Sequence, residues 1–475
     1  MKPRNSNVTG LIFANNYTNT AKNLHCNPDI YREQQSKLYL NRERLLHLTR
    51  YGVHSSIFKL TSYLFSIFRP MLRLDLKAHH KIALAYFFLA ALLGIFLRLF
   101  YVTPVPGNYK YILHTHSHIA LLGWVYLALT GIIYRLFFHK TELSRKYIYI
   151  FLATNISLLG MLFSFPFQGY AVISIIFSTL FLICSYFYAG FVLRNIPKKH
   201  STTKSFKLIK AALWYMVISS IGPWALGGIM STLGNTSIWY KLAVYFYLHF
   251  QYNAWFLVAL LGIVFYLFQK LNIDFGRKKF KRFFLLLNSG VILSFFLSTY
   301  WTNPPLIFYL MGGLGVILLL IAFYQFFAFI LRNRNLLKTG LSSFSYRLLM
   351  ISGILLVGKI LMQSLSAIPF FADLAFNNLD FVIGYLHWVF LGFVSLALFA
   401  FLNWFKLIRI PKNAFYLYLS GFLISEALIF YKGLVLWLGL PFFGNYFLLL
   451  VLVSALMPIA VGWILGVNLV KRQPQ

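Results

Sequence analysis

Residues 113–124 read LHTHSHIALLGW and place three alternating histidines, His114, His116 and His118, at the mouth of a long apolar segment. The whole chain contains only 12 histidines. An imidazole at the edge of hydrocarbon is costly to desolvate, so a histidine in that position usually has a task. We therefore interpret this stretch as a source of ligands for haem or another metal in a polytopic membrane protein.

The composition agrees with a membrane location. Of the 475 residues, 60% are hydrophobic, 19% are aromatic and only 11% are charged, whereas soluble proteins have about 25% charged residues. Apolar runs of about 20 residues recur along the sequence, and each is long enough to cross a bilayer. The sequence therefore predicts an all-α polytopic membrane protein in a lipid bilayer.

The charge is strongly basic, with 43 Lys+Arg, 9 Asp+Glu and a net charge of +34. The basic residues lie in loops between apolar runs, which is the topology signal of membrane proteins and not the footprint of a nucleic-acid partner. The two cysteines, Cys26 and Cys184, belong to no CxxC or Cys/His cluster. A disulfide framework, a zinc ribbon and covalent c-type haem attachment are therefore unsupported.

The first 70 residues differ from the remainder. They are rich in Asn, Arg, Ser and Tyr, and no apolar run in them is long enough to span a bilayer. We expect residues 1–70 to form a basic, poorly ordered extension, in which 56–69 can lie amphipathically in the interface. In a second interpretation the functional chain begins at Met71. In both, residues 71–475 form the transmembrane domain.

The apolar runs predict twelve spans. Lys and Arg concentrate in every second connection, so the positive-inside rule predicts that both termini are cytoplasmic. Pro223 is expected to kink the fifth span. The predicted spans are 82–102, 113–137, 147–166, 170–193, 209–231, 241–269, 283–302, 306–331, 346–367, 381–405, 415–437 and 444–469.

Three predicted spans carry histidine at nearly one level. At about 1.5 Å per residue, His118 and His387 lie ~9 Å and His249 ~12 Å below the outer ends of spans two, ten and six. His114 shares a helical face with His118, while His116 points roughly the opposite way. A single buried histidine is more often a hydrogen-bonded core residue than a ligand, but a layer formed by three helices favours ligation.

The faces of the helices divide these residues further. His249 and Asn253 share a face, whereas Tyr385 and His387 diverge by about 200°. His114, the nearest of the three to the surface, has the weakest claim to be a ligand. Four other histidines flank spans beside Lys and Arg, and we interpret them as interfacial anchors: His79, His80, His139 and His200.

Ionisable groups inside spans are functional hypotheses by default. Arg98 lies near the outer end of span one, where it can snorkel or pair with a haem propionate. Lys359 and Glu426 lie near the middle of spans nine and eleven. Either they form a mutual ion pair or they belong to a proton path, and the sequence leaves both interpretations open.

Together these features resemble subunit I of the haem–copper oxidase superfamily, nitric oxide reductases included. The stretch LHTHSHIALLGW is similar to the second helix of that family, which carries a ligand of the low-spin haem. The family has His-x-His in span ten, and here the stretch is Tyr385-Leu386-His387. The resemblance implies a b-type haem held by His387 and by His116 or His118, with Tyr385 in the place of the high-spin haem ligand.

The resemblance weakens at the second metal site of the family. His249 matches the active-site histidine of span six, but Asn253 stands where the family has tyrosine or glutamate. Span seven ends LSTYWTN, residues 297–303, without the adjacent histidine pair of the family. A second haem, copper or iron would have to use His249 and Asn253, with His114 as the remaining candidate ligand.

The resemblance implies a redox protein of the bacterial cytoplasmic membrane, an oxidoreductase of the oxygen or nitric oxide reductase type if it is an enzyme. Bis-imidazole ligation leaves no open iron position, so such a haem would transfer electrons and not bind gas. A cytochrome or quinol donor and small partner subunits are the implied partners. The alternative is a transporter or sensor that binds a metal or haem with the same histidine layer.

Overall fold

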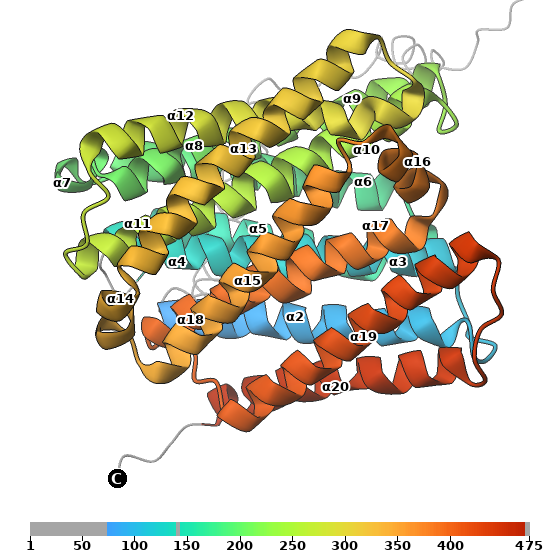
Figure 1. Cartoon of the computed structure of the whole chain (residues 1–475). Coiled ribbons are helices and arrows are strands. Elements are labelled where there is room, and N and C mark those ends of the chain that lie inside the picture. The colour runs from blue at the N-terminus through green and yellow to red at the C-terminus, as the bar shows by residue number, and fades with distance from the viewer. Residues whose placement is uncertain (1–73, 139–142, 471–475) are drawn as a thin grey trace, which may run out of the picture. The chain divides into compact units, whose positions relative to one another are not determined.

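A computed structural model describes residues 74–138 and 143–470. The chain divides into two compact units, Met1–Leu72 and Arg73–Gln475, and all the described residues belong to the second. The basic extension predicted for residues 1–70 and the alternative start at Met71 lie outside the described residues. Within the described part, every regular element is a helix (Figure 1).

Twelve helical segments of the described chain are long and apolar enough to cross a membrane, which confirms the predicted all-α, polytopic fold class. Seven of these spans are single helices and five are composite. The single ones are α2 (Leu76–Leu99), α5 (Arg145–Gln168), α6 (Val172–Asn195), α13 (Leu306–Arg332), α15 (Ser343–Leu365), α19 (Lys412–Leu438) and α20 (Tyr446–Leu469).

Four of the composite spans join segments of different helical type, and span five joins two α-helices. Segments η1, η2 and η4 are π-helices, and segment η3 is a 3₁₀-helix. Span two consists of α3 (Tyr109–His118), η1 (Ile119–Tyr126) and α4 (Leu127–Phe138), and span six consists of α10 (Ile238–His249), η2 (Phe250–Phe256) and α11 (Leu257–Lys270). Span ten consists of α17 (Leu379–His387), η4 (Trp388–Val394) and α18 (Ser395–Trp404). Span five consists of α8 (Lys204–Ser219) and α9 (Ile221–Thr232), and span seven of α12 (Arg277–Leu293) and η3 (Ser294–Thr302). Three short helices lie between spans: α7 (Lys198–Ser201), α14 (Arg334–Gly340) and α16 (Pro369–Asn377).

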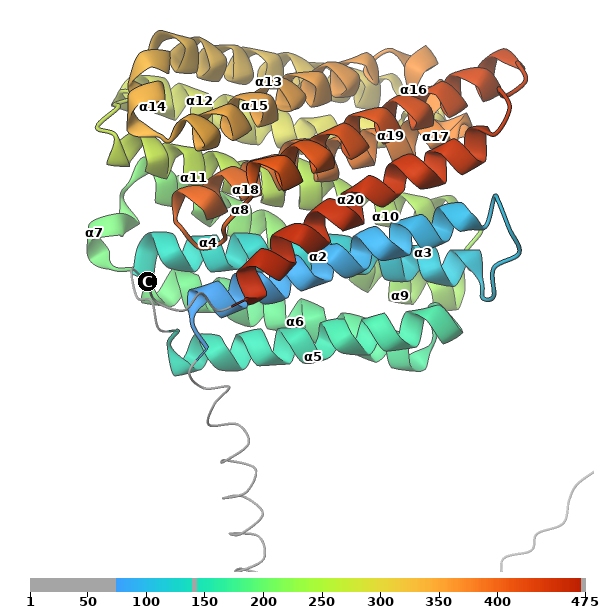
Figure 2. The ribbon, with the colours of Figure 1, turned by 90° about the horizontal axis from the view of Figure 1, so that it is seen from below.

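Spans two, six and ten form the centre of the bundle. In their most apolar parts, 83%, 89% and 67% of the residues are buried, against 33–44% in the other nine spans. Neighbouring spans pack around them, with α5 on α6, α12 on α13 and α19 on α20, and the first span α2 packs on the last span α20 (Figures 1 and 2). The three central spans are the ones that carry the predicted histidine layer.

The outer helices expose large apolar side chains. Phe167 is 82% exposed, Tyr324 75% and Ile354 65%. Water would penalise such a surface, whereas lipid tails cover it at little cost. The distribution of apolar side chains therefore fits a bundle surrounded by a bilayer.

The fifth span is interrupted at the predicted place. Helix α8 ends at Ser219, α9 begins at Ile221, and Pro223 is the third residue of α9. Proline lacks the N–H that would bond back by four residues, and its ring clashes with the carbonyl of that residue. The side-chain hydroxyl of Ser219 accepts a hydrogen bond from the Gln251 amide at 2.9 Å, which links the break to span six.

The interpretation of His79 and His80 as interfacial anchors is wrong. Both side chains are fully buried; His79 Nε2 lies 2.8 Å from the Leu127 carbonyl, and His80 Nδ1 lies 2.6 Å from the Leu76 carbonyl. A Cβ atom on Gly131 of α4 would lie 2.6 Å from the His80 ring. These histidines therefore fasten α2 to α4, because a basic neighbourhood indicates depth along a helix and not the face that a side chain occupies.

The other two proposed anchors have different outcomes. His200 is 8% exposed and its ring contacts Phe137 at 5.6 Å between ring centres. It is therefore a packed side chain and not an interfacial anchor. His139 lies outside the described residues.

Candidate functional site

The three histidines of the opening stretch take two directions, with His114 and His118 on one side and His116 on the other. The His116 ring faces His387 of span ten, with the two ring centres 6.4 Å apart. His118 instead packs on Phe165 of α5 at 4.7 Å, and His114 lies 4.6 Å from the Tyr170 ring. The bundle thus brings together one histidine of span two and the histidine of span ten.

His118 has both ring nitrogens in hydrogen-bonding contact with the protein. Its Nδ1 lies 2.8 Å from the His114 carbonyl, to which it donates, and its Nε2 lies 3.2 Å from the Tyr170 hydroxyl. A carbonyl can only accept, so Nδ1 carries the proton and Nε2 accepts from the tyrosine. His118 therefore has no lone pair left for a metal in this arrangement.

His116 has one engaged nitrogen and one available nitrogen. Its Nδ1 lies 2.9 Å from the Ala90 carbonyl of α2 and donates to it. This bond places the proton on Nδ1 and leaves the lone pair on Nε2, the tautomer that a metal ligand needs. Gly94 permits the approach, because a Cβ there would already lie 3.2 Å from His116 Cε1.

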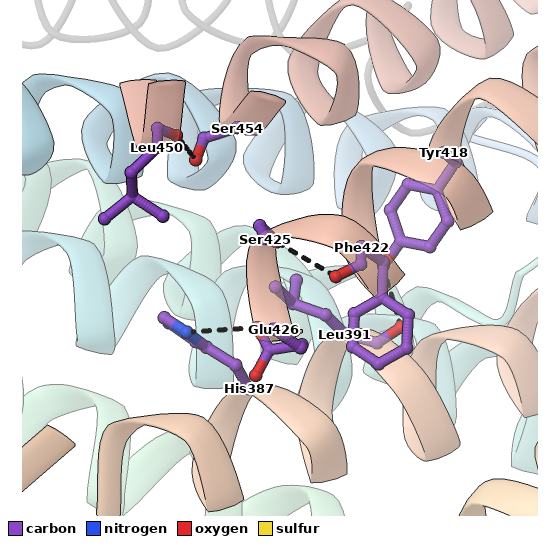
Figure 3. A network of polar contacts seen from close by, with 8 residues as sticks. All are labelled: His387, Leu391, Tyr418, Phe422, Ser425, Glu426, Leu450 and Ser454. Carbon is purple, nitrogen blue, oxygen red and sulfur yellow. Dashed lines mark hydrogen bonds and ion pairs between the residues drawn. The ribbon is translucent and has the colours of Figure 1, made fainter. Parts of the chain in front are cut away.

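His387 meets a buried carboxylate on its other side. Its Nδ1 lies 3.5 Å from Glu426 Oε1 of α19, as Figure 3 shows. Glu426 is 1% exposed, whereas 25% of the His387 side chain remains exposed although span ten is one of the three central spans. The carboxylate therefore lies close to Nδ1 without forming a hydrogen bond, and the imidazole is only partly covered by the protein.

The two facing rings are nearly perpendicular, with an angle of 89° between their planes. In the part of the chain that the structure describes, neither His116 nor His387 has a hydrogen bond at Nε2. Two imidazoles whose Nε2 atoms make no hydrogen bond to the described chain thus lie next to each other between spans two and ten. Such a pair of rings is suited to bind a metal between them.

Arg98 lies in the same electrostatic environment. Its positive charge acts electrostatically on Glu426, His116 and His387. Its Nη1 atom is shielded from solvent and has no hydrogen-bond partner among the described residues. A shielded, unpaired guanidinium N–H is suited to bind an anionic group of a ligand.

His249, the third member of the predicted layer, is in a different environment. It is 2% exposed; its Nε2 lies 2.9 Å from the Val291 carbonyl and its Nδ1 lies 3.2 Å from the Asn253 side-chain amide. Both nitrogens are thus engaged, and Asn253 serves His249 as a hydrogen-bond partner. The Tyr385 ring contacts Tyr252 of span six at 6.0 Å.

Lys359 and Glu426 do not pair with each other, so the mutual ion pair that the sequence left open is wrong. Lys359 donates a hydrogen bond to Gln363 on its own helix, one turn away. Glu426 approaches His387 instead. The two groups are on nearby spans at similar depth, but their helices turn them toward different partners.

A feature that the sequence interpretation missed is the π-helix that follows each central histidine. Helices α3, α10 and α17 end at His118, His249 and His387, and η1, η2 and η4 begin at the next residue. A π-helix inserts an extra residue per turn, is rare, and frequently occurs at functional sites. The local signal is a small residue followed by an aromatic one, five and six positions after the histidine: Gly123-Trp124, Ala254-Trp255 and Gly392-Phe393.

No cluster of three or more His, Cys, Asp or Glu side chains suited to a metal ion occurs among residues 74–138 and 143–470. Comparisons with known proteins give no assignment either. No protein-family model matches the chain, and no curated protein sequence is significantly similar to it.

Proposed function

We propose that this protein is a haem-binding electron-transfer protein of the membrane, with one b-type haem between His116 and His387. The observation that carries the proposal is the distance between the two rings. A metal–imidazole bond is about 2.0–2.1 Å long and a ring nitrogen lies about 1.2 Å from the ring centre, so two imidazoles on opposite sides of one metal have centres roughly 6.3–6.6 Å apart. The ring centres here are 6.4 Å apart.

The hydrogen-bonding state of the rings supports the same assignment. Histidine ligands generally donate their second N–H to a carbonyl or carboxylate, which fixes the tautomer and the ring orientation. His116 donates to a carbonyl, and His387 has a carboxylate near Nδ1. His118 has neither nitrogen free, and for that reason the proposal names His116 as the ligand of span two.

Arg98 provides a partner for the acidic edge of a haem. Its unpaired Nη1 atom lies in the part of the bundle that holds the two facing histidines. A guanidinium binds a carboxylate through parallel N–H···O bonds, so Arg98 is suited to a propionate. The haem supplies a reversible one-electron couple, and two imidazole ligands leave its iron closed to gases.

The second metal site of the resembling family does not fit the residues present. A metal at His249 would have to displace the Val291 carbonyl or the Asn253 amide from the ring nitrogens. The Tyr385 ring packs on the Tyr252 ring. In the described chain Tyr385 makes no bond with His249 or with another candidate metal ligand. The proposal therefore requires one haem and assigns no reductive chemistry on oxygen or nitric oxide to span six.

The likeness to subunit I of the haem–copper oxidases remains part of this proposal. It is supported by twelve spans and by the central position of spans two, six and ten, each with a histidine. The distribution of Lys and Arg supports both termini in the cytoplasm, and the likeness to this family implies a bacterial cytoplasmic membrane. A cytochrome or quinol would then deliver the electrons, with or without small partner subunits.

Absorption spectroscopy of the purified protein tests the haem assignment. We expect wild type to show the spectrum of a bis-imidazole b-type haem, and His116→Ala or His387→Ala to lose most of the bound haem because one axial bond is removed. The matched controls His118→Ala and His249→Ala should retain it. A colourless wild type, or loss of haem in His118→Ala but not in His116→Ala, would contradict the assignment.

A further inference from the structure

Glu426 is a buried acidic side chain whose environment is unusual for a carboxylate. It is 1% exposed, and neither of its carboxylate oxygens has a hydrogen-bond partner in the described part of the chain. The neighbouring Ser425 and Tyr418 hydroxyl groups donate to the Phe422 and Leu391 carbonyls and not to Glu426 (Figure 3). A buried carboxylate without partners is costly, so its retention needs a reason.

The contact of Glu426 with His387 provides such a reason. Glu426 Oε1 lies 3.5 Å from His387 Nδ1, and the hydrogen-bond potential of that nitrogen is otherwise unused among the described residues. A carboxylate can only accept, so its presence favours the proton on Nδ1 and the lone pair on Nε2 of His387. A small movement of either side chain would shorten this contact to a hydrogen bond.

The two facing histidines are therefore not equivalent. His116 donates to the neutral Ala90 carbonyl, whereas His387 has a carboxylate behind it. A carboxylate withdraws the Nδ1 proton more strongly than a carbonyl, which makes the ring a better electron donor to a metal. When Glu426 is ionised, a state that the positive charge of Arg98 favours, its negative charge also favours the oxidised state of a nearby metal, because the interior screens charges weakly.

We propose that Glu426 is the positioning residue of His387: it orients the imidazole and lowers the reduction potential of the haem. This inference rests on the proposed haem between His116 and His387. Arg98 acts on the same site with the opposite sign, because its positive charge favours the reduced state. Glu426 and Arg98 thus set the potential jointly, and Glu426 acts through the ligand itself.

A redox titration of the purified, haem-loaded protein tests this role. Glu426→Gln keeps the size of the side chain and removes its charge. We expect an upward shift of the midpoint potential equivalent to a tenfold or greater change in the ratio of reduced to oxidised haem, which is about 59 mV for one electron. Glu426→Asp keeps the charge and is expected to shift the potential in the same direction by less.

Two controls separate this role from a structural one. Tyr418→Phe removes the hydrogen bond from α19 to the Leu391 carbonyl of η4, and Ser425→Ala removes the neighbouring hydroxyl, but neither touches His387. Both should leave the midpoint potential unchanged. The electron paramagnetic resonance spectrum of the ferric low-spin haem gives a second readout, since a changed His387 alters its g values in Glu426→Gln and not in the controls.

The outcomes distinguish this inference from the proposed function. A haem-bearing wild type whose potential and g values are the same in Glu426→Gln overturns the role of Glu426 and leaves the haem assignment intact. An equal shift in Tyr418→Phe also overturns it, because the effect would then come from helix packing. A colourless wild type overturns both proposals. If Glu426→Gln cannot be purified, a potential in Glu426→Asp identical to wild type is the result that overturns it.

Discussion

At the scale of single residues, hydrogen bonding at the imidazole nitrogens separates the histidines of the central layer. His116 and His387 keep Nε2 available, whereas His118 and His249 have both nitrogens engaged. A metal ligand needs a free lone pair, so histidines at similar depth differ in their ability to bind a metal. We therefore interpret the hydrogen bond between Asn253 and His249 as a structural contact.

Removal of the Asn253 side chain tests that interpretation. Asn253→Ala leaves His249 Nδ1 buried without a partner, and an unsatisfied buried polar group costs about 1–3 kcal/mol. We expect a lower thermal unfolding temperature in detergent with an unchanged haem spectrum. Asn155→Ala is a suitable control, since Asn155 bonds only to the Phe151 carbonyl of its own helix at 2.8 Å. Loss of haem or metal in Asn253→Ala would show that span six contributes a ligand.

At the scale of the elements, close helix contacts through glycine hold the histidine spans against their neighbours. Gly123 of η1 meets Tyr86 of α2, and Gly392 of η4 meets Phe422 of α19; a Cβ would lie 2.8 Å and 2.6 Å from those side chains. Both glycines stand five residues after a central histidine. The π-helix and the small residue together allow α2 and α19, which carry Ala90 and Glu426, to approach the facing rings.

Gly131 and Gly190 form a matched pair for testing this kind of contact. Gly131→Ala places a Cβ 2.6 Å from the His80 ring, and overpacking of this type costs about 1–3 kcal/mol. Gly190→Ala in α6 meets no atom within 4 Å and should stabilise the helix by about 0.5–1 kcal/mol. Thermal unfolding in detergent should therefore shift in opposite directions, and equal shifts would contradict the packing of α2 on α4.

At the scale of the whole described bundle, the alternation of basic loops predicts a membrane topology. A reporter enzyme fused after residue 475 should be active on the cytoplasmic side, because the Lys- and Arg-rich connections remain there. A reporter inserted in the connection at 103–108, which precedes α3, should be active on the opposite side. The same activity at both positions would contradict an even number of spans with cytoplasmic termini.

The sequence by itself determined the fold class, the twelve spans, the interruption of span five near Pro223 and the three spans that carry the histidine layer. Hydropathy, proline and depth along a helix are local properties, and they can be read from neighbouring residues. Only the tertiary structure decided that His116 and not His118 faces His387, that Glu426 approaches His387 and not Lys359, and that His79 and His80 are buried. The physical reason is rotation about the helix axis. Which face of a span meets which neighbour depends on packing between segments that are far apart in the chain, and on π-helical turns that change the face after each histidine.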